Sequence, residues 1–138
     1  MAEDLKAFAK RFNDEVLSKG NLEVLDEVVA DDFVDHQEMP GMPTGKEGVR
    51  AFTTTFRAAF PDLAVKTLAA VVEGDEVWIY SSMRGTHEGE FMGIPPTGKT
   101  FEITGFDRVR IKDGQAVEHW GVFEDLAMMQ QLGVAPEM

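Results

Sequence analysis

The apolar residues of this chain change their spacing near residue 62, and this change restricts the possible folds more than any other feature of the sequence. Before that point they recur every three or four residues, which is the period of a helix with one buried face. After it, segments rich in Val, Ile, Phe and Thr are separated by turns that contain glycine, as β-strands are. Helices followed by strands, with no repeat and no long linker, predict one α+β domain over 1–138.

Three helices and one extended segment are predicted in the first part of the chain. The first helix covers 4–18 and ends at a Lys-Gly-Asn sequence. Asn21 is expected to cap a second helix, 21–29, because its side-chain oxygen can accept a free backbone N–H. An extended segment, 31–36, follows, and a third helix is predicted over 46–59.

Four strands and a short helix are predicted in the second part. The strands 63–74 and 75–89 meet at Gly-Asp, which suits a hairpin. The strands 100–111 and 115–124 form a second hairpin around Lys-Asp-Gly. The helix 125–133 ends at a glycine, a common helix terminator. We therefore expect an antiparallel sheet with helices on one face.

The register of the second hairpin decides which polar side chains meet. A three-residue loop, 112–114, places Asp107 directly opposite His119, whereas a two-residue Asp-Gly turn places Arg108 there instead. The first register is favoured because it brings opposite charges together. Its other facing pairs are Arg108 with Glu118, Phe106 with Trp120, and Gly105 with Gly121.

One face of this hairpin mixes apolar side chains with groups that handle protons. His119, Phe123 and Asp125 share it with Asp107, because alternate residues of a strand point the same way. Two facing glycines predict a bend or a cavity, and a small-molecule site needs a cavity. A carboxylate against apolar walls can deprotonate the carbon next to a carbonyl when a donor, such as an imidazole, stabilises the enolate oxygen.

Composition and charge argue against several classes of function. The chain has no cysteine, so disulfides, thiolate nucleophiles and cysteine-ligated metals are excluded. Its three histidines have neither HxH nor HxxxH spacing, so no metal site is expected. A net charge of -12 without a basic run argues against nucleic acid and anionic membranes. The charged N-terminal segment and the lack of a long apolar run predict a soluble, cytoplasmic protein.

The segments DDFVDHQ, GTHEGEFMGIPPTGK, FDRVRIKDGQAVEHW and DLAMMQQLG, in this order, resemble the SnoaL-like polyketide cyclase (ester cyclase) family over nearly the whole chain. The resemblance implies the α+β fold of nuclear transport factor two, ketosteroid isomerase and scytalone dehydratase. In that fold, N-terminal helices pack on a strongly bent antiparallel sheet and form a cone-shaped pocket. It also implies ring closure in a polyketide ester by intramolecular aldol condensation, with an aspartate as general acid and base and with no cofactor or metal.

The resemblance and the mixed face together define the candidate catalytic residues. Asp125 is expected at the position of the family's aspartate, and Asp107 remains a rival for the base. His119 is the third catalytic candidate, as a donor to the substrate oxygen. Two structural alternatives remain open: Asp125 as the N-cap of the last helix, and His119 as a core histidine bonded to Asp107.

The candidate substrate-binding residues come from several parts of the chain. His36 is included because an Asn or His after the second helix lines the pocket in the family, and the others are Phe52, Phe56, Phe123 and His87. For His36 and His87 the alternative is an exposed surface position. For Phe52 and Phe56 it is a place in the core.

The leading hypothesis is a cyclase or isomerase-type enzyme that acts on a hydrophobic carbonyl compound without a cofactor. The alternatives are a non-catalytic module that binds a small molecule, or an enzyme of the dehydratase, hydroxylase or epoxide hydrolase type. Phe106 and Trp120 form an apolar patch on the outer sheet face, and this patch predicts a homodimer through that face.

Overall fold

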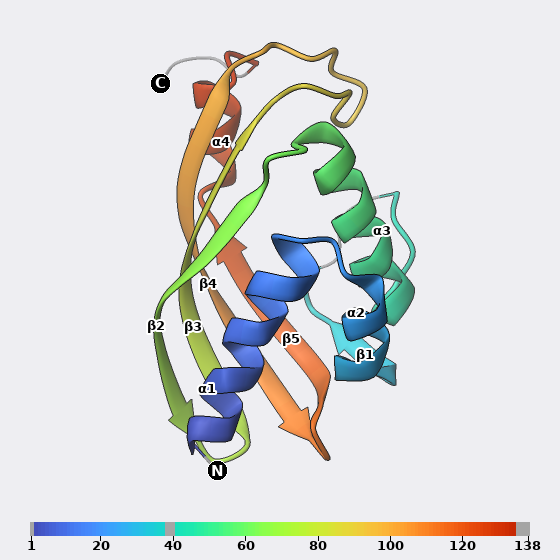
Figure 1. The fold of residues 1–138 in the computed structure, drawn as a ribbon, viewed down its shortest axis with the longest axis vertical. Coiled ribbons are helices and arrows are strands. Elements are labelled where there is room, and N and C mark those ends of the chain that lie inside the picture. Colours follow the sequence, from blue (N-terminus) through green and yellow to red (C-terminus); the bar gives the residue numbers. More distant parts are fainter. Residues whose placement is uncertain (1, 38–40, 135–138) are drawn as a thin grey trace.

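The computed structural model describes residues 2–37 and 41–134, in which four α-helices and one π-helical turn pack against a five-stranded sheet (Figure 1). Both predicted hairpins and all the predicted helices are present. In chain order the elements are α1 (Ala2–Arg11), η1 (Phe12–Leu17), α2 (Leu22–Val28), β1 (Val29–Asp35), α3 (Gly45–Ala59), β2 (Ala64–Glu73), β3 (Glu76–Thr86), β4 (Thr100–Lys112), β5 (Gln115–Phe123) and α4 (Asp125–Gln131).

The first predicted helix is α-helical only in its first part. From Phe12 it continues as the wide turn η1, in which the Ser18 N–H donates to the Asn13 carbonyl five residues back. Such π-turns insert one extra residue and are frequent at functional sites. Phe12 and its neighbour Asn13 both line the interior cavity described below. The predicted cap of α2 is confirmed, since the Asn21 side chain accepts the Val24 N–H.

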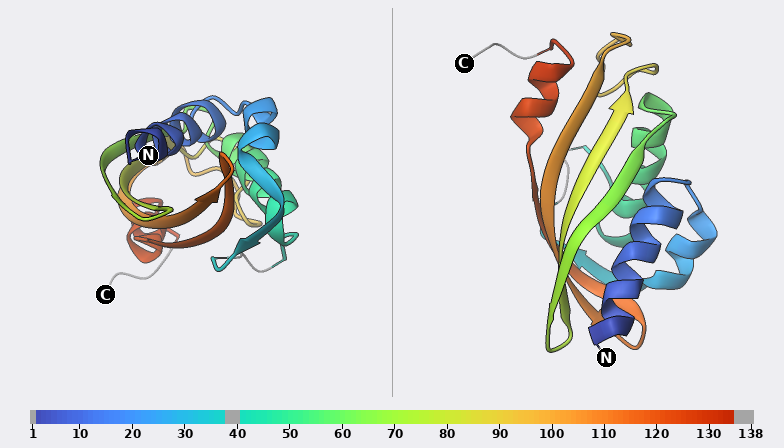
Figure 2. Two further views of the ribbon diagram at one scale, coloured as in Figure 1. Left: turned by 90° about the horizontal axis from the view of Figure 1, so that it is seen from below. Right: turned by 60° about the vertical axis from the view of Figure 1, so that its left-hand side comes forward.

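The sheet has the order β1-β5-β4-β3-β2 and is curled, with α1 and α3 on its concave side (Figure 2). All neighbouring strands are antiparallel except β1, which runs parallel to β5. The expected extended segment is thus a fifth strand, and the sheet is mixed and not wholly antiparallel. The α+β architecture with a strongly bent sheet is confirmed.

The register of the β4–β5 hairpin differs from both predicted registers. Asp113 and Gly114 form a two-residue turn with positive φ angles of 53° and 76°, so Lys112 faces Gln115. A bulge near Ala116 then shifts the pairing by one residue, which places Val109 opposite His119 and Asp107 opposite Gly121. The other predicted pairs are also wrong. Those observed are Gly105 with Phe123, Phe106 with Val122, Arg108 with Trp120 and Arg110 with Glu118.

The bulge has a simple consequence for the inner face. Turn and bulge together move the pairing by two residues from the favoured register, and a shift of two keeps every side chain on its face. Asp107 and His119 therefore lie on neighbouring strands with both side chains inward, as predicted, although they are not directly opposite.

A continuous apolar core joins the helices to the concave face of the sheet. Leu25, Phe60 and Phe101 are among its fully buried side chains. The convex face instead leaves large apolar side chains in solvent, including Phe106 and Val122. None of the helices within 2–37 and 41–134 is long and apolar enough to cross a membrane.

Candidate functional site

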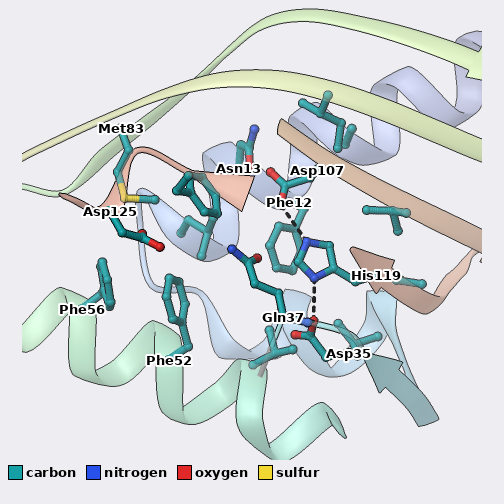
Figure 3. Close-up of a pocket in the computed structure, with 18 of the residues that line it drawn as sticks. Phe12, Asn13, Asp35, Gln37, Phe52, Phe56, Met83, Asp107, His119 and Asp125 are labelled. Atoms are coloured by element: carbon teal, nitrogen blue, oxygen red, sulfur yellow. Dashed lines mark hydrogen bonds and ion pairs between the residues drawn. The ribbon is translucent and has the colours of Figure 1, made fainter. Parts of the chain in front are cut away.

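A cavity of about 500 Å³ lies between the concave sheet face and the helices (Figure 3). Its walls are mostly apolar and aromatic, and they include Phe12, Phe52, Phe56, Met83, Ile103 and Phe123. Six polar side chains reach it, from Asn13, Asp35, Gln37, Asp107, His119 and Asp125. Neither lysine nor arginine occurs among the described residues that line it. An apolar cavity with a few polar groups is the usual form of a small-molecule site.

His119 is held between two carboxylates at one end of this cavity. Its Nδ1 lies 2.8 Å from Asp35 Oδ1, and its Nε2 lies 2.6 Å from Asp107 Oδ1 (Figure 3). The three side chains come from β1, β5 and β4, and each is 17–18% exposed. We call this group the triad. Both imidazole nitrogens are occupied by carboxylates, so His119 has no ring N–H left for a ligand.

The two carboxylates decide the charge of the imidazole. Burial alone lowers the pKa of His119, but the hydrogen bonds and charges of Asp107 and Asp35 outweigh it and raise the pKa to about 9. Burial raises the pKa of Asp35, and its bonds to His119 and to the Gln37 N–H reverse this and hold it below its usual range. At neutral pH the triad is therefore an imidazolium between carboxylates.

Asp125 reaches the cavity from another side, at the first residue of α4. It is not the N-cap of that helix, since Glu124 holds this position and binds the Thr104 N–H and hydroxyl with its carboxylate. The Asp125 carboxylate points into the cavity near Phe52, Phe56 and Met83 (Figure 3). Within the part of the chain that the structure describes, this carboxylate has no hydrogen bond or ion pair, and the residue is exposed.

Three polar residues of the cavity were not among the predicted site residues. Asp35 directly precedes His36, the residue that was predicted, and the strand alternation turns Asp35 inward and His36 outward. Gln37 follows them, and its backbone N–H donates to Asp35 Oδ1 at 2.9 Å.

Asn13 is the third of these residues. It is buried in η1 and donates through Nδ2 to Thr67 and Ser81. Its spacing from Ala9 and Val16 puts a polar residue on a helix's apolar face, a signal that was available in the sequence.

The predicted binding residues divide into two groups. Phe52, Phe56 and Phe123 line the cavity as expected. His36 does not, because it stacks on Trp120 on the outer face, with ring centroids 4.8 Å apart, and binds Glu118. His87 does not either.

The position of His87 also differs from the exposed alternative. The side chain is fully buried, packs on Phe60 and is hydrogen-bonded through Nδ1 to Thr97. The glycines that flank it in the sequence suggested an exposed loop, but the loop folds back over the aromatic core. Its side chain therefore lies in the aromatic core and outside the cavity.

The polar residues of the cavity do not form a cluster of metal ligands. Among the described residues, no group of three or more His, Asp and Glu side chains converges as metal ligands do. In the triad the carboxylates lie on opposite sides of the imidazole ring.

Comparison with known proteins assigns a family to this arrangement. The model of the family described as SnoaL-like polyketide cyclase matches residues 7–132. Among characterised proteins, the nogalonic acid methyl ester cyclase of Streptomyces nogalater is 28% identical over 118 residues, which are 83% of this chain and 87% of that protein.

Solved structures agree with this likeness. IdmH from Streptomyces antibioticus is 36% identical with a TM-score of 0.79, over 96% of this chain and 99% of that one. TsrD from Streptomyces laurentii is 26% identical with a TM-score of 0.87, over 96% and 97%. The fold is also that of ketosteroid isomerase-like proteins.

Proposed function

Because the chain belongs to the SnoaL-like polyketide cyclase family, we propose that it closes a ring in a neutral, hydrophobic polyketide ester by intramolecular aldol condensation. In this proposal Asp125 is the general acid and base, and no cofactor or metal takes part. The observation that carries the proposal is the difference between the carboxylates of the cavity.

Only one of these carboxylates is suited to take a proton from carbon. Asp35 and Asp107 each use a carboxylate oxygen to bind the His119 ring, and the bonds to His119 and to the Gln37 N–H hold the pKa of Asp35 below its usual range. Asp125 has no such partner among the described residues and faces apolar side chains. Because no other described side chain engages its oxygens, the Asp125 carboxylate is available to take up a proton from a substrate, and this supports Asp125 as the proton shuttle.

The protein has only to transfer a proton, because the new C–C bond forms between two carbons of the substrate. The Asp125 carboxylate removes a proton from a carbon next to a substrate carbonyl, and the C–H electron pair forms an enolate. The enolate carbon then attacks a second carbonyl of the same molecule, and the new C–C bond leaves an alkoxide. Protonated Asp125 returns the proton to this alkoxide, so the product is an isomer of the substrate and the enzyme is regenerated.

The charge of the cavity supports a neutral substrate. Three carboxylates face one imidazolium, and no lysine or arginine is among the described lining residues. A substrate with a free carboxylate would place another anion in this apolar and already negative cavity, which costs free energy. An ester avoids this cost. The relative from Streptomyces nogalater is named for a methyl ester, in line with this argument.

The first test is turnover of nogalonic acid methyl ester and of related polyketide esters by the wild type and by Asp125→Asn. Loss of a positioned general base lowers turnover by about 10²–10⁴. Asp32→Asn is the matched control, since Asp32 is exposed on β1 and does not line the cavity, and it should keep full activity.

Two results would contradict this proposal. Full turnover in Asp125→Asn would move the base to one of the triad carboxylates, and full turnover in Asp107→Asn and Asp35→Asn as well would exclude a carboxylate base. Tight binding of the esters without turnover by the wild type would favour the alternative of a binding module.

A further inference from the structure

We propose that the Gln37 side-chain amide donates the hydrogen bond that stabilises the substrate's enolate oxygen, and that Gly121 is a glycine in order to leave room for this amide. The inference deepens the proposed function and depends on it. It replaces the imidazole of His119, which was the donor expected from the sequence.

Gln37 has the only uncommitted side-chain N–H groups among the described residues that line the cavity. Three lining side chains carry N–H groups, those of Asn13, Gln37 and His119. Asn13 donates to Thr67 and Ser81, at 2.8 and 3.1 Å. His119 directs both nitrogens at carboxylates of the triad. The Gln37 amide makes no hydrogen bond within the described residues.

The backbone of Gln37 is fixed by the triad. Asp35 Oδ1 accepts the Gln37 backbone N–H at 2.9 Å and also lies 2.8 Å from His119 Nδ1. One carboxylate oxygen thus connects the residue that carries the amide to the buried imidazolium. Donors that are positioned before the reaction are effective because they need not reorganise as charge develops.

The side chain then extends across the cavity, against β5. Figure 3 shows the amide between the Asp125 carboxylate on one side and Asp107 and His119 on the other, with its nitrogen toward the side of Asp125. A carbonyl compound whose oxygen meets this nitrogen can present its neighbouring carbon to Asp125. Base and donor then act on adjacent atoms of one substrate, as enolisation requires.

Gly121 makes this position of the amide possible. A Cβ atom at residue 121 would overlap Gln37 Oε1 and would lie 2.8 Å from Asp107 Oδ1. The residue lies within β5, where a side chain would normally be favourable, so its absence needs a local reason. The close approach of the Gln37 amide, together with that of the Asp107 carboxylate, is that reason.

The kinetic test compares Gln37→Met and Gly121→Ala with the wild type. Methionine has a similar length but no donor, so Gln37→Met should lower kcat by about 10²–10³, the usual loss for one oxyanion donor, with a small change in KM. Gly121→Ala should lower kcat because it displaces the amide. Gln115→Met is the matched control, because the Gln115 amide binds the Glu27 carbonyl away from the cavity, and kcat should be unchanged.

A double variant tests the link between the two residues. In the background of Gln37→Ala, which removes the amide, Gly121→Ala should cost little more. If the full effect of Gly121→Ala persisted there, it would act through Asp107, and the proposed role of Gly121 would be wrong.

An infrared measurement tests the donor without turnover. The probe is 2-acetylnaphthalene labelled with ¹³C at the carbonyl. A hydrogen bond lowers the carbonyl stretching frequency, so the bound ketone should show a lower frequency with the wild type and with Asp125→Asn than with Gln37→Met. Equal frequencies with the wild type and Gln37→Met would overturn the donor role even if Asp125 is the base. Failure of the wild type to bind the ketone would contradict the carbonyl site itself.

Discussion

The inner and outer faces of the sheet each hold a histidine bonded to carboxylate, and the two histidines are neighbours. His36, the residue directly after β1, donates its backbone N–H to the His119 carbonyl at 2.8 Å. His119 points into the cavity between Asp35 and Asp107, whereas His36 points outward to Glu118 and stacks on Trp120. The same residue types thus occur on opposite faces of the same part of the sheet.

Burial makes these two groups chemically different. The His119 side chain is 17% exposed, and its carboxylates raise its pKa to about 9. The His36 side chain is 41% exposed, and water screens its attraction to Glu118. Exposed ion pairs contribute about 0–1 kcal/mol, while breaking a buried one is far more costly. The inner group can therefore set the charge of a site, and the outer group can do little more than hold two strands together.

The largest expected effect is that of His119→Leu on stability. This change leaves Asp35 and Asp107 half-buried without their cation, and removal of one partner of a buried pair costs about 3–5 kcal/mol. The free energy of unfolding, from urea denaturation at pH 6, should fall by this amount. Adding Asp107→Asn to His119→Leu should recover part of the loss. A loss below about 1 kcal/mol would mean that the triad is as screened as the outer pair.

The pH dependence of stability should follow the pKa of His119. Because folding raises this pKa from 6.5 to about 9, the stabilisation is complete below 6.5 and is lost as the pH rises through 9. The loss should approach about 3 kcal/mol, since one pKa unit corresponds to about 1.4 kcal/mol. Asp35, whose pKa is lowered, adds stability that is lost only as the pH falls below its ordinary value of 3.8. Unfolding of His119→Leu should lack the alkaline decline, and an identical decline in both proteins would exclude His119 as its source.

The pattern of the sequence was enough to predict the elements, and not enough to predict their pairing. Helical and strand periods are local properties, so the helices and both hairpins follow from them. The bulge near Ala116 is not local, because it depends on how β5 fits between β4 and β1. Asp107 and His119 were nevertheless placed on the right face, since an error of two residues preserves the alternation of side chains.

The site was predicted only where its residues lie within long helices or strands. The residues on β4, β5 and α3 follow from alternation within long elements. Which of Asp35 and His36 points inward depends on the parallel pairing of β1 with β5, and nothing in a seven-residue strand determines that pairing. Gln37 lies beyond the strand, where no period applies. Its place in the cavity depends on a glycine more than eighty positions away, at residue 121.

We expect a dimer interface on the convex face of the sheet. A substitution there should have the next largest effect. Of the two residues predicted for this patch, Phe106 is exposed, whereas Trp120 is partly covered by the stacked ring of His36. We define the outer patch as Trp78, Phe106 and Val122, which are 44%, 53% and 67% exposed. Phe106→Glu places a charge in the patch and should weaken self-association at least tenfold in sedimentation equilibrium. Turnover per active site should be unchanged, because the side chain points away from the cavity. A wild type that is monomeric at micromolar concentration would contradict the interface.

The smallest effect is expected for the outer histidine. His36→Ala removes an exposed pair with Glu118 and one ring stack, and it should lower the free energy of unfolding by at most about 1 kcal/mol. Turnover should change less than twofold. A large loss of turnover in His36→Ala would mean that the two faces are coupled more strongly than their separate contacts indicate.

The charge of His119 is the decisive measurement, because the assignment of Asp125 as the base requires that the other two carboxylates are held by an imidazolium. Nitrogen-15 NMR of the imidazole reports its protonation state. We expect a doubly protonated His119 ring at pH 7, which loses a proton with a pKa of about 9. A neutral ring at pH 7, with one nitrogen unprotonated, would contradict it, because one of Asp35 and Asp107 would then be free to act as a base.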